Sequence, residues 1–509
     1  MAFAVHAKPM VLKMASYIIG IDIGTSATKT AVYRLDGTVV AEKSHEYPLY
    51  QPHNGWAEQN PLDWWEAVCI TLRDVTKKID PKEVAGVGFS GQMHGLVMLD
   101  ENNTVIRPAI IWCDSRTGEE CDEIHALVGR DNLMEITASP ALTGFTASKI
   151  RWVQKHEPEQ YARCRHILLP KDYIRFMLSG EYHTDASDAS GMQLLDIRTR
   201  NWSPFVCDRL GIDMSLLAEV RESPQAVSVV SREAAALTGL AEGTILAAGA
   251  GDNAAAAVGT GVVSEGKAFT TIGTSGVVFA HIKTPAVDSM GRIHTFCCAV
   301  PGEYHTMGVT QAAGLSLQWF KNNFAKDDAY QELDRMAESL PIGAERLLYL
   351  PYLMGERTPH LDPDCRGVFF GLSAIHTTAH LYRAVLEGVS YSLCDAYELV
   401  AKTGTLITDM AICGGGAKSP FWRQMIADVY GIPLTDMSRG GGASLGAAIL
   451  GGVAGGAYRD VPSACAAVIK GGAVSTPDAS HHFAYAAYLT QYRSLYSTLA
   501  PQFKTLSVL

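Results

Sequence analysis

The stretch that decides the fold is Asp22-Ile23-Gly24-Thr25-Ser26, because its last four residues recur as Ile272-Gly273-Thr274-Ser275, about half of the 509-residue chain further along. Each copy lies between two short strand-like runs, 18–23 and 29–33 for the first copy and 268–272 and 277–281 for the second. Such runs on either side of a glycine turn predict a hairpin. Similarity at half the chain length indicates two related domains, and we place their boundary near residues 248–252.

Strands and helices alternate around both hairpins. A helix is expected to begin at Pro61, with Asn60 as its N-cap and Asp63 in its first turn. Further strands are expected at 38–43, 84–90, 96–99, 244–248 and 410–413, and further helices at 311–324, 376–401, 420–430 and 444–450. The alternation predicts an α/β protein. Because 509 residues are too many for one compact core, two domains are expected.

Composition excludes several function classes. The formal net charge is −11 and no block of Lys and Arg occurs, which argues against nucleic acid or an anionic membrane surface as a partner. The eleven cysteines show no CxxC spacing, which favours reduced thiols and a cytoplasmic location. Residues 1–16 contain His6, Lys8, Pro9 and Lys13, so they form neither a signal peptide nor a membrane span and are interpreted as an N-terminal extension.

The two hairpin turns are candidate phosphate sites. A tight turn of Gly, Thr and Ser presents backbone N–H groups and hydroxyls to an anion, and two such turns on two closing domains would grip a nucleotide triphosphate. Each turn alone could equally be an ordinary hairpin. Asp22 would point into the same cleft, where a carboxylate beside phosphates implies Mg²⁺, directly or through water; the alternative is an Asp that caps its own turn. The run 261–267 is not a P-loop, because Ala268 follows where Ser or Thr is required.

Asp252 is the candidate catalytic base. It follows an apolar strand at the small-residue turn Gly249-Ala250-Gly251-Asp252-Asn253. A positioned carboxylate that accepts the proton of a sugar hydroxyl contributes about 10²–10⁴-fold to a rate. The alternative is an Asp that caps the following helix.

Two polar clusters could hold a sugar. One is Ser90-Gly91-Gln92-Met93-His94-Gly95, and the other is Trp112-Cys113-Asp114-Ser115-Arg116. Sugars are bound by fixed donors and acceptors together with an apolar face, and both clusters supply them. A purely structural role for the His and Trp side chains is the alternative. The glycines at 414–416 would let a base or ribose approach the backbone closely.

These motifs together resemble the FGGY carbohydrate kinases of the actin–hexokinase–Hsp70 superfamily, and most of all the members that act on D-xylulose. The resemblance runs from about Tyr17 to the helix at Ser444. The motifs that carry it are Asp22-Ile23-Gly24-Thr25-Ser26, Ser90-Gly91-Gln92-Met93-His94-Gly95, Gly251-Asp252-Asn253, Gly273-Thr274-Ser275-Gly276, Gly355-Glu356-Arg357-Thr358-Pro359 and Gly414-Gly415-Gly416-Ala417. It implies two actin-like (ribonuclease H-like) domains with an ATP and sugar cleft between them, and ATP-dependent phosphorylation of D-xylulose to D-xylulose 5-phosphate.

The resemblance also assigns roles to residues. Asp252 would be the general base, and Asp22 would lie in the Mg²⁺ region. The expected sugar-binding residues are Gln92, Met93, His94, Trp112, Asp114, Arg116, Asp252 and Asn253. The expected ATP-binding residues are Gly24, Thr25, Ser26, Gly273, Thr274, Ser275, Gly314, Gln318, Gly415, Gly416 and Ser419. No role is assigned to Glu356 or Arg357 beyond a structured loop at the cleft.

Several alternatives stay open at this stage. The substrate could be another sugar or polyol, such as ribulose, erythritol or gluconate, and a non-catalytic actin-like sugar sensor is a further reading, although such a protein would be expected to lose Asp252. The expected domains are 17–249 for sugar binding and 250–475 for nucleotide binding. The helix at 476–509 is expected to pack back on the first domain. The expected partners are a sugar and ATP, and a homodimer is compatible with the sequence.

Overall fold

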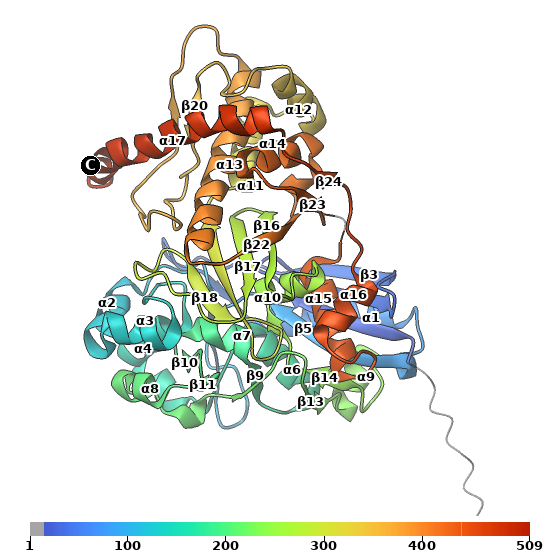
Figure 1. Cartoon of the computed structure of the whole chain (residues 1–509). Coiled ribbons are helices and arrows are strands. Elements are labelled where there is room, and N and C mark those ends of the chain that lie inside the picture. Colours follow the sequence, from blue (N-terminus) through green and yellow to red (C-terminus); the bar gives the residue numbers. More distant parts are fainter. Residues whose placement is uncertain (1–14, 439) are drawn as a thin grey trace, which may run out of the picture.

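The computed structural model describes residues 15–438 and 440–509. Two α/β domains lie one above the other, with the first half of the chain in the lower domain of Figure 1 and most of the second half in the upper one. Each domain contains one large sheet. The predicted fold class is therefore confirmed, while the expected extension at 1–16 falls almost entirely outside the described residues.

The first sheet is built on the predicted hairpin. β1 (Tyr17–Ile23) pairs antiparallel with β2 (Ala27–Arg34), which pairs antiparallel with β3 (Val39–Glu46). On its other side β1 pairs in parallel with β5 (Val84–Gly91), and β5 pairs in parallel with β14 (Ile245–Ala247). The strand order is therefore β3-β2-β1-β5-β14.

The second sheet repeats this pattern. β16 (Gly266–Ile272) and β17 (Gly276–Ile282) form the second predicted hairpin, and β17 pairs antiparallel with β19 (Tyr304–Thr310). β16 also pairs in parallel with β22 (Ile407–Cys413), which pairs in parallel with β23 (Leu434–Asp436). In the order β19-β17-β16-β22-β23, each pair of neighbouring strands has the same parallel or antiparallel pairing as the corresponding pair of the first sheet. The two domains are therefore built on one topology, as the repeated motif predicts.

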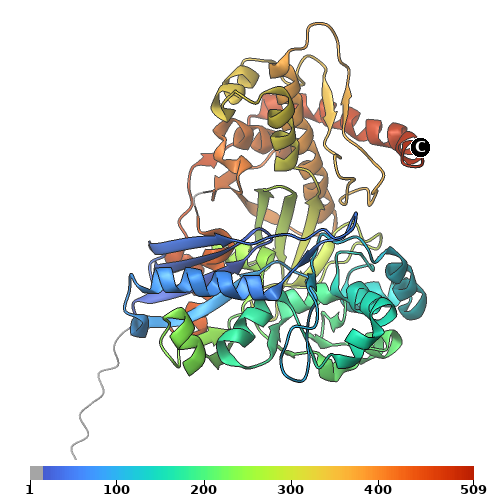
Figure 2. The same cartoon turned by 180° about the vertical axis from the view of Figure 1, so that it is seen from behind.

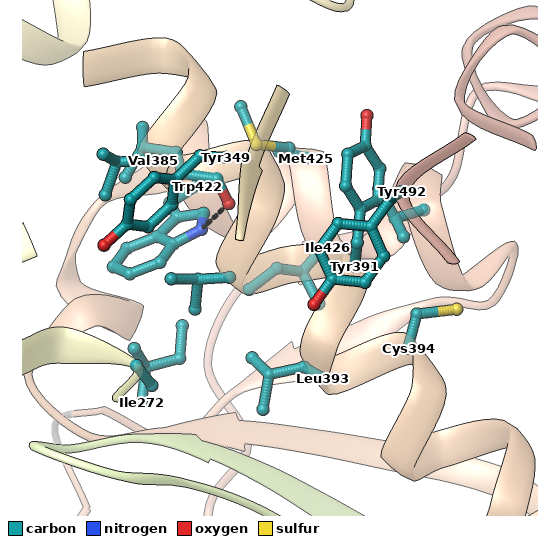
Figure 3. Packing of buried hydrophobic residues seen from close by; sticks show 14 of the residues in the cluster. Ile272, Tyr349, Val385, Tyr391, Leu393, Cys394, Trp422, Met425, Ile426 and Tyr492 are labelled. Carbon is teal, nitrogen blue, oxygen red and sulfur yellow. Dashed lines mark hydrogen bonds between the residues drawn. The ribbon is translucent and has the colours of Figure 1, made fainter. Parts of the chain in front are cut away.

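Helices cover both sheets and begin where local signals predict them. The side chain of Asn60 accepts a hydrogen bond from the backbone N–H of Leu62 and caps α1 (Pro61–Thr76), which buries Trp64 against the first sheet. In the second domain the fully buried Trp422 donates through its indole N–H to Leu386 O at 3.2 Å (Figure 3). The main helices of that domain are α11 (Gly314–Phe324), α12 (Tyr330–Glu338), α13 (Thr378–Lys402) and α14 (Pro420–Tyr430).

One helix from late in the sequence returns to the first domain. α15 (Gly442–Ala454) packs on β1 and β5 and against α10 (Asp252–Gly259), as the red helix beside the blue strands in Figure 1 shows. A Cβ on Gly20 of β1 would come within 1.9 Å of Ser444 O, and a Cβ on Gly446 within 1.8 Å of Ala255 O. Only glycine allows the backbones to approach this closely. The two glycines therefore let α15 pack tightly against the first domain.

The terminal helix corrects one expectation. α17 (Ala479–Leu506) packs against α13, α14 and β20 (Leu348–Leu350) of the second domain, not against the first domain. The buried face of α17 is part of the hydrophobic core of the second domain. Its Tyr492 Oη lies 2.8 Å from Tyr352 Oη. The prediction was wrong because the segment that returns to the first domain is α15 with α16 (Val461–Val468).

The described residues also restrict other roles. All eleven cysteines are free. In residues 15–438 and 440–509, no helix combines the length and apolar character needed to cross a bilayer. The same residues contain no group of three His, Cys, Asp or Glu side chains that could hold a metal ion.

Candidate active site

Three parallel strands bring two carboxylates together at their carboxyl ends. β15 (Ala250–Gly251) and β1 both pair with β5, so that Ala250 and Asp22 flank Ser90 in register. Asp22 Oδ1 accepts a hydrogen bond of 2.8 Å from Ser90 Oγ. Asp252 follows β15 directly as the first residue of α10. Ligands of α/β sheets bind beyond such strand ends, so this edge of the sheet is the candidate site.

The electrostatics of Asp252 suit a base that works near neutral pH. Burial, and secondarily the negative charge of Asp22, raise the pKa of Asp252 to about 7. The carboxylate accepts hydrogen bonds from Asn253 N at 2.7 Å and Asn253 Nδ2 at 3.0 Å. Gly251, not Asp252, occupies the N-cap position of α10. One carboxylate oxygen therefore serves the first turn of α10 through the N–H of Asn253, and the other makes no hydrogen bond to the described residues.

Asp22 shares this environment. Burial raises its pKa, while the Ser90 hydrogen bond and the charge of Lys29 act in the opposite direction. The charge of Asp22 in turn helps to raise the pKa of Asp252. A divalent cation would stabilise such neighbouring carboxylates, because Mg²⁺ is bound in proteins by one or two carboxylates together with substrate phosphates. The residues present therefore fit the predicted Mg²⁺ region.

Polar side chains hold the first hairpin turn in place. Trp112 Nε1 donates to Thr25 Oγ1 at 2.8 Å, and Gln59 Nε2 donates to Thr25 O at 2.7 Å. The buried Gln92 donates in turn to Gln59 Oε1 at 2.7 Å, and Tyr47 Oη donates to Gly24 O. Gln92 and Trp112, expected to bind sugar, thus position the turn. Ser26 is exposed at its tip.

Met93 and His94 lie beside Asp252 in a row. A Cβ on Gly251 would come within 2.9 Å of Met93 Cγ, and a Cβ on Gly191 would meet both the His94 ring at 2.4 Å and Met93 Cε at 3.2 Å. The Met93 side chain therefore fills the space between the Asp252 turn and the His94 ring. The row is an apolar floor with a carboxylate at one end and an imidazole at the other.

The protonation of His94 follows from its surroundings. Burial, together with the positive charge of Lys149, holds the pKa of His94 well below its usual value, so the ring is neutral at pH 7. Its Nδ1 lies 2.9 Å from Gly191 O, and because a carbonyl only accepts, Nδ1 carries the proton. Nε2 is then an acceptor, suited to a sugar hydroxyl. The ring also packs on Phe145, with centroids 4.6 Å apart.

Asp114 and Arg116 are placed differently from the expectation. Arg116 forms ion pairs with Asp114 at 2.6 Å and Glu58 at 2.8 Å, and its guanidinium lies 3.6 Å from the Trp56 ring centroid. The Asp114 and Arg116 side chains are 0% and 1% exposed. Asp114 also accepts from Ala57 N at 2.6 Å. Both residues are taken up by this buried network.

A cavity of about 530 Å³ in the second domain contains most of the expected nucleotide residues. It lies between the second hairpin, the start of α11 and the glycine turn after β22. Its lining includes seven expected residues, namely Gly273, Thr274, Gly314, Gln318, Gly415, Gly416 and Ser419. Ser275 is not part of the lining. The volume falls within the range of about 300–1,000 Å³ that small-molecule sites occupy.

Other residues of this cavity carry no signal in the sequence. Tyr330, Asp334 and Tyr382 come from α12 and α13 and close one side, where Tyr382 Oη donates to Asp334 Oδ1 at 2.8 Å. Single aromatic and acidic residues on amphipathic helices read as ordinary surface or core positions, so only the fold reveals them. Ser419 also has a second task, because its Oγ accepts from Trp422 N and caps α14.

The loop with Glu356 and Arg357 gains a definite structure. Glu356 is 3% exposed and accepts hydrogen bonds from Gln311 N at 2.9 Å, Arg357 N at 2.7 Å and Thr310 Oγ1. Burial raises the pKa of Glu356 to about 7. The Arg357 side chain points toward the first domain, where a Cβ on Gly144 would lie 3.8 Å from Nη2.

Comparison with known proteins identifies the family. The model of the FGGY family of carbohydrate kinases, N-terminal domain, matches residues 17–259, and that of the C-terminal domain matches residues 268–455. The chain belongs to the FGGY family of carbohydrate kinases, and it is a carbohydrate kinase.

Individual relatives cover nearly the whole chain. The xylulose kinase of Bacillus subtilis (strain 168) is 39% identical over 483 residues, which cover 94% of this chain and 97% of the relative. The crystal structure of a xyloylose kinase from Brucella ovis is 35% identical and superposes with a TM-score of 0.89 over 96% of this chain and 100% of that one. The structure of a gluconate kinase from Lactobacillus acidophilus gives a TM-score of 0.91 at 27% identity, over 96% and 99%. The fold alone therefore does not decide the sugar.

Proposed function

We propose that this protein transfers the terminal phosphoryl group of ATP to the terminal hydroxyl of D-xylulose and so forms ADP and D-xylulose 5-phosphate. The observation that carries the proposal is the Asp252 carboxylate, whose pKa is about 7 and which stands at the ends of three parallel strands beside the first hairpin. The similarity to relatives named as xylulose kinases supports the choice of sugar.

The nucleotide would bind across both domains. Its adenosine would occupy the cavity lined by Gln318 and Gly415, and its phosphates would extend between the turns at Thr25 and Thr274. The backbone N–H groups of these turns suit phosphate oxygens. Asp22 would hold Mg²⁺, directly or through water, and that ion supplies charge neutralisation to the phosphates when it is bound.

The sugar would lie along the row of Asp252, Met93 and His94. Its terminal hydroxyl would donate to the free oxygen of Asp252, which accepts the proton as the oxygen attacks phosphorus, and the bond from phosphorus to the ADP oxygen breaks. His94 Nε2 would accept a hydrogen bond from a hydroxyl further along the sugar. Asn253 holds Asp252 in orientation through its two hydrogen bonds. Domain closure would exclude water, so that ATP is not hydrolysed in place of sugar phosphorylation.

Release of ADP across a panel of acceptors tests the proposal. The panel contains D-xylulose, D-ribulose, L-ribulose, erythritol, glycerol and gluconate at equal concentrations, with no acceptor as the blank. We expect kcat/KM for D-xylulose to exceed that for every other acceptor by at least tenfold. A higher kcat/KM for gluconate or for a polyol would replace D-xylulose as the substrate, and release that does not depend on any acceptor would contradict a sugar kinase.

A further inference from the structure

Arg357 of the second domain is held on a rigid loop between β20 and β21 (Val368–Phe370). The next residue, Thr358, donates from its backbone N–H to Val309 O at 2.9 Å and from its hydroxyl to Arg292 O at 2.6 Å. The preceding Glu356 is buried and bonded to the same domain. The backbone of Arg357 is therefore held on both sides.

The guanidinium of Arg357 reaches the sugar site of the first domain. Nη2 lies near Gly144, which directly precedes Phe145, the ring that packs on His94. Burial lowers the pKa of His294 to about 3, and the positive charge of Arg357 lowers it further. The same charge also helps to lower the pKa of His94. Arg357 is thus a cation at the His94 end of the row.

This guanidinium has no partner within residues 15–438 and 440–509. None of its nitrogens makes a hydrogen bond or an ion pair, although the side chain is half-buried and burial lowers its pKa. The neighbouring carboxylate of Glu356 is occupied by Thr310, Gln311, Ser392 and the Arg357 backbone. Burying a charged group without a hydrogen-bond partner is unfavourable, so five unpaired donors beside Gly144 indicate an acceptor supplied by a ligand.

We propose that Arg357 binds the hydroxyketone end of the sugar, donating to the carbonyl oxygen at C2 and the hydroxyl oxygen at C1. This inference rests on the proposed function. With the C5 hydroxyl at Asp252, an extended pentulose over Met93 brings C1 and C2 to the His94 end, where the guanidinium lies. A carbonyl oxygen offers two acceptor positions and no donor, which matches a group that only donates. Arg357 is then the residue by which the second domain recognises a ketose.

The test compares Arg357→Gln with the wild type on two acceptors, D-xylulose and xylitol, which differ at C2. We expect kcat/KM for D-xylulose to fall about 10-fold to 100-fold, the effect of removing a hydrogen bond from a charged donor. For xylitol we expect a fall of less than about threefold; where its turnover is slow, its inhibition constant against D-xylulose serves instead. Arg357→Lys keeps the positive charge but loses the planar set of guanidinium donors. Its kcat/KM for D-xylulose should therefore lie between those of the wild type and Arg357→Gln.

Arg366→Gln is the matched control, since Arg366 lies on the same loop and is exposed, and among the described residues it donates only to the backbone carbonyls of residues 363 and 365. It should leave both acceptors unchanged. Equal losses on D-xylulose and xylitol in Arg357→Gln and Arg357→Lys would overturn the inference, as would a parallel loss of sugar-independent ATP hydrolysis, which would indicate a phosphoryl contact. If the wild type phosphorylates no pentulose, the proposed function fails together with this inference; if it phosphorylates D-xylulose and the losses are equal, only the inference fails.

Discussion

The pH dependence of sugar phosphorylation should report the state of Asp252. A base must be deprotonated to accept a proton, and burial with the nearby charge of Asp22 raises the pKa of Asp252 to about 7. Roughly nine-tenths of the enzyme is then in the active form at about pH 8 and roughly one-tenth at about pH 6. We therefore expect kcat/KM for D-xylulose to fall about tenfold from the higher to the lower of these two pH values. Below them, a plot of log kcat/KM against pH should have a slope of one.

The assay is direct chromatography of ADP from about pH 5.5 to about pH 9, because coupling enzymes have their own pH dependence. In Asp252→Asn the rate should fall by about 10²–10⁴-fold, and the residual rate should show no acid limb near pH 7. Glu356 also has a pKa raised to about 7 by burial, so Glu356→Gln is the necessary control, and this variant should keep the limb. A limb that survives in Asp252→Asn, or that disappears in Glu356→Gln, would refute the assignment of the base.

Three further perturbations have defined outcomes. A Cβ in Gly314→Ala would lie 2.4 Å from Gly273 O, so the second turn must shift, and we expect the Kd for ADP, measured by calorimetry, to rise at least tenfold while sugar binding is unaffected. His94→Ala should raise the KM for D-xylulose more than tenfold without changing sugar-independent ATP hydrolysis, and equal effects on both would remove the residue from the sugar site. Lys171→Met leaves three buried carboxylates without their shared cation and should lower the free energy of unfolding in urea by about 3–5 kcal/mol, whereas Lys29→Met, which breaks a half-exposed pair, should change it by less than about 1 kcal/mol.

The parts of the fold that were predictable depend on local chemistry. The turn at Gly24 and its echo at Gly273 marked two hairpins, and the Asn60-Pro61 pair marked the start of α1. Asp252 could be found because an apolar strand leads directly into the small-residue turn that carries it. These features involve residues close together in the chain, so one sequence contains them completely.

The remaining features depend on contacts between distant residues. Arg116 is enclosed by Glu58 and Trp56, which lie more than fifty residues earlier in the chain, so its sequence neighbours do not reveal that it is buried. The partner of α17 could not be read from its apolar stripe, since a stripe indicates that a helix packs but not against which domain. Tyr382 and the guanidinium of Arg357 belong to the site only because the fold brings them there. The exact domain boundary, the homodimer and the cytoplasmic location stay predictions.

The central claim is that two equivalent turns hold one nucleotide with Asp252 at the acceptor hydroxyl between them. A crystal structure of the full chain with a non-hydrolysable ATP analogue and D-xylulose tests it most directly. The account predicts the γ-phosphate between Thr25 and Thr274, and the C5 hydroxyl within about 3 Å of Asp252. A γ-phosphate bound to only one turn, or a sugar whose C5 hydroxyl lies away from Asp252, would contradict it.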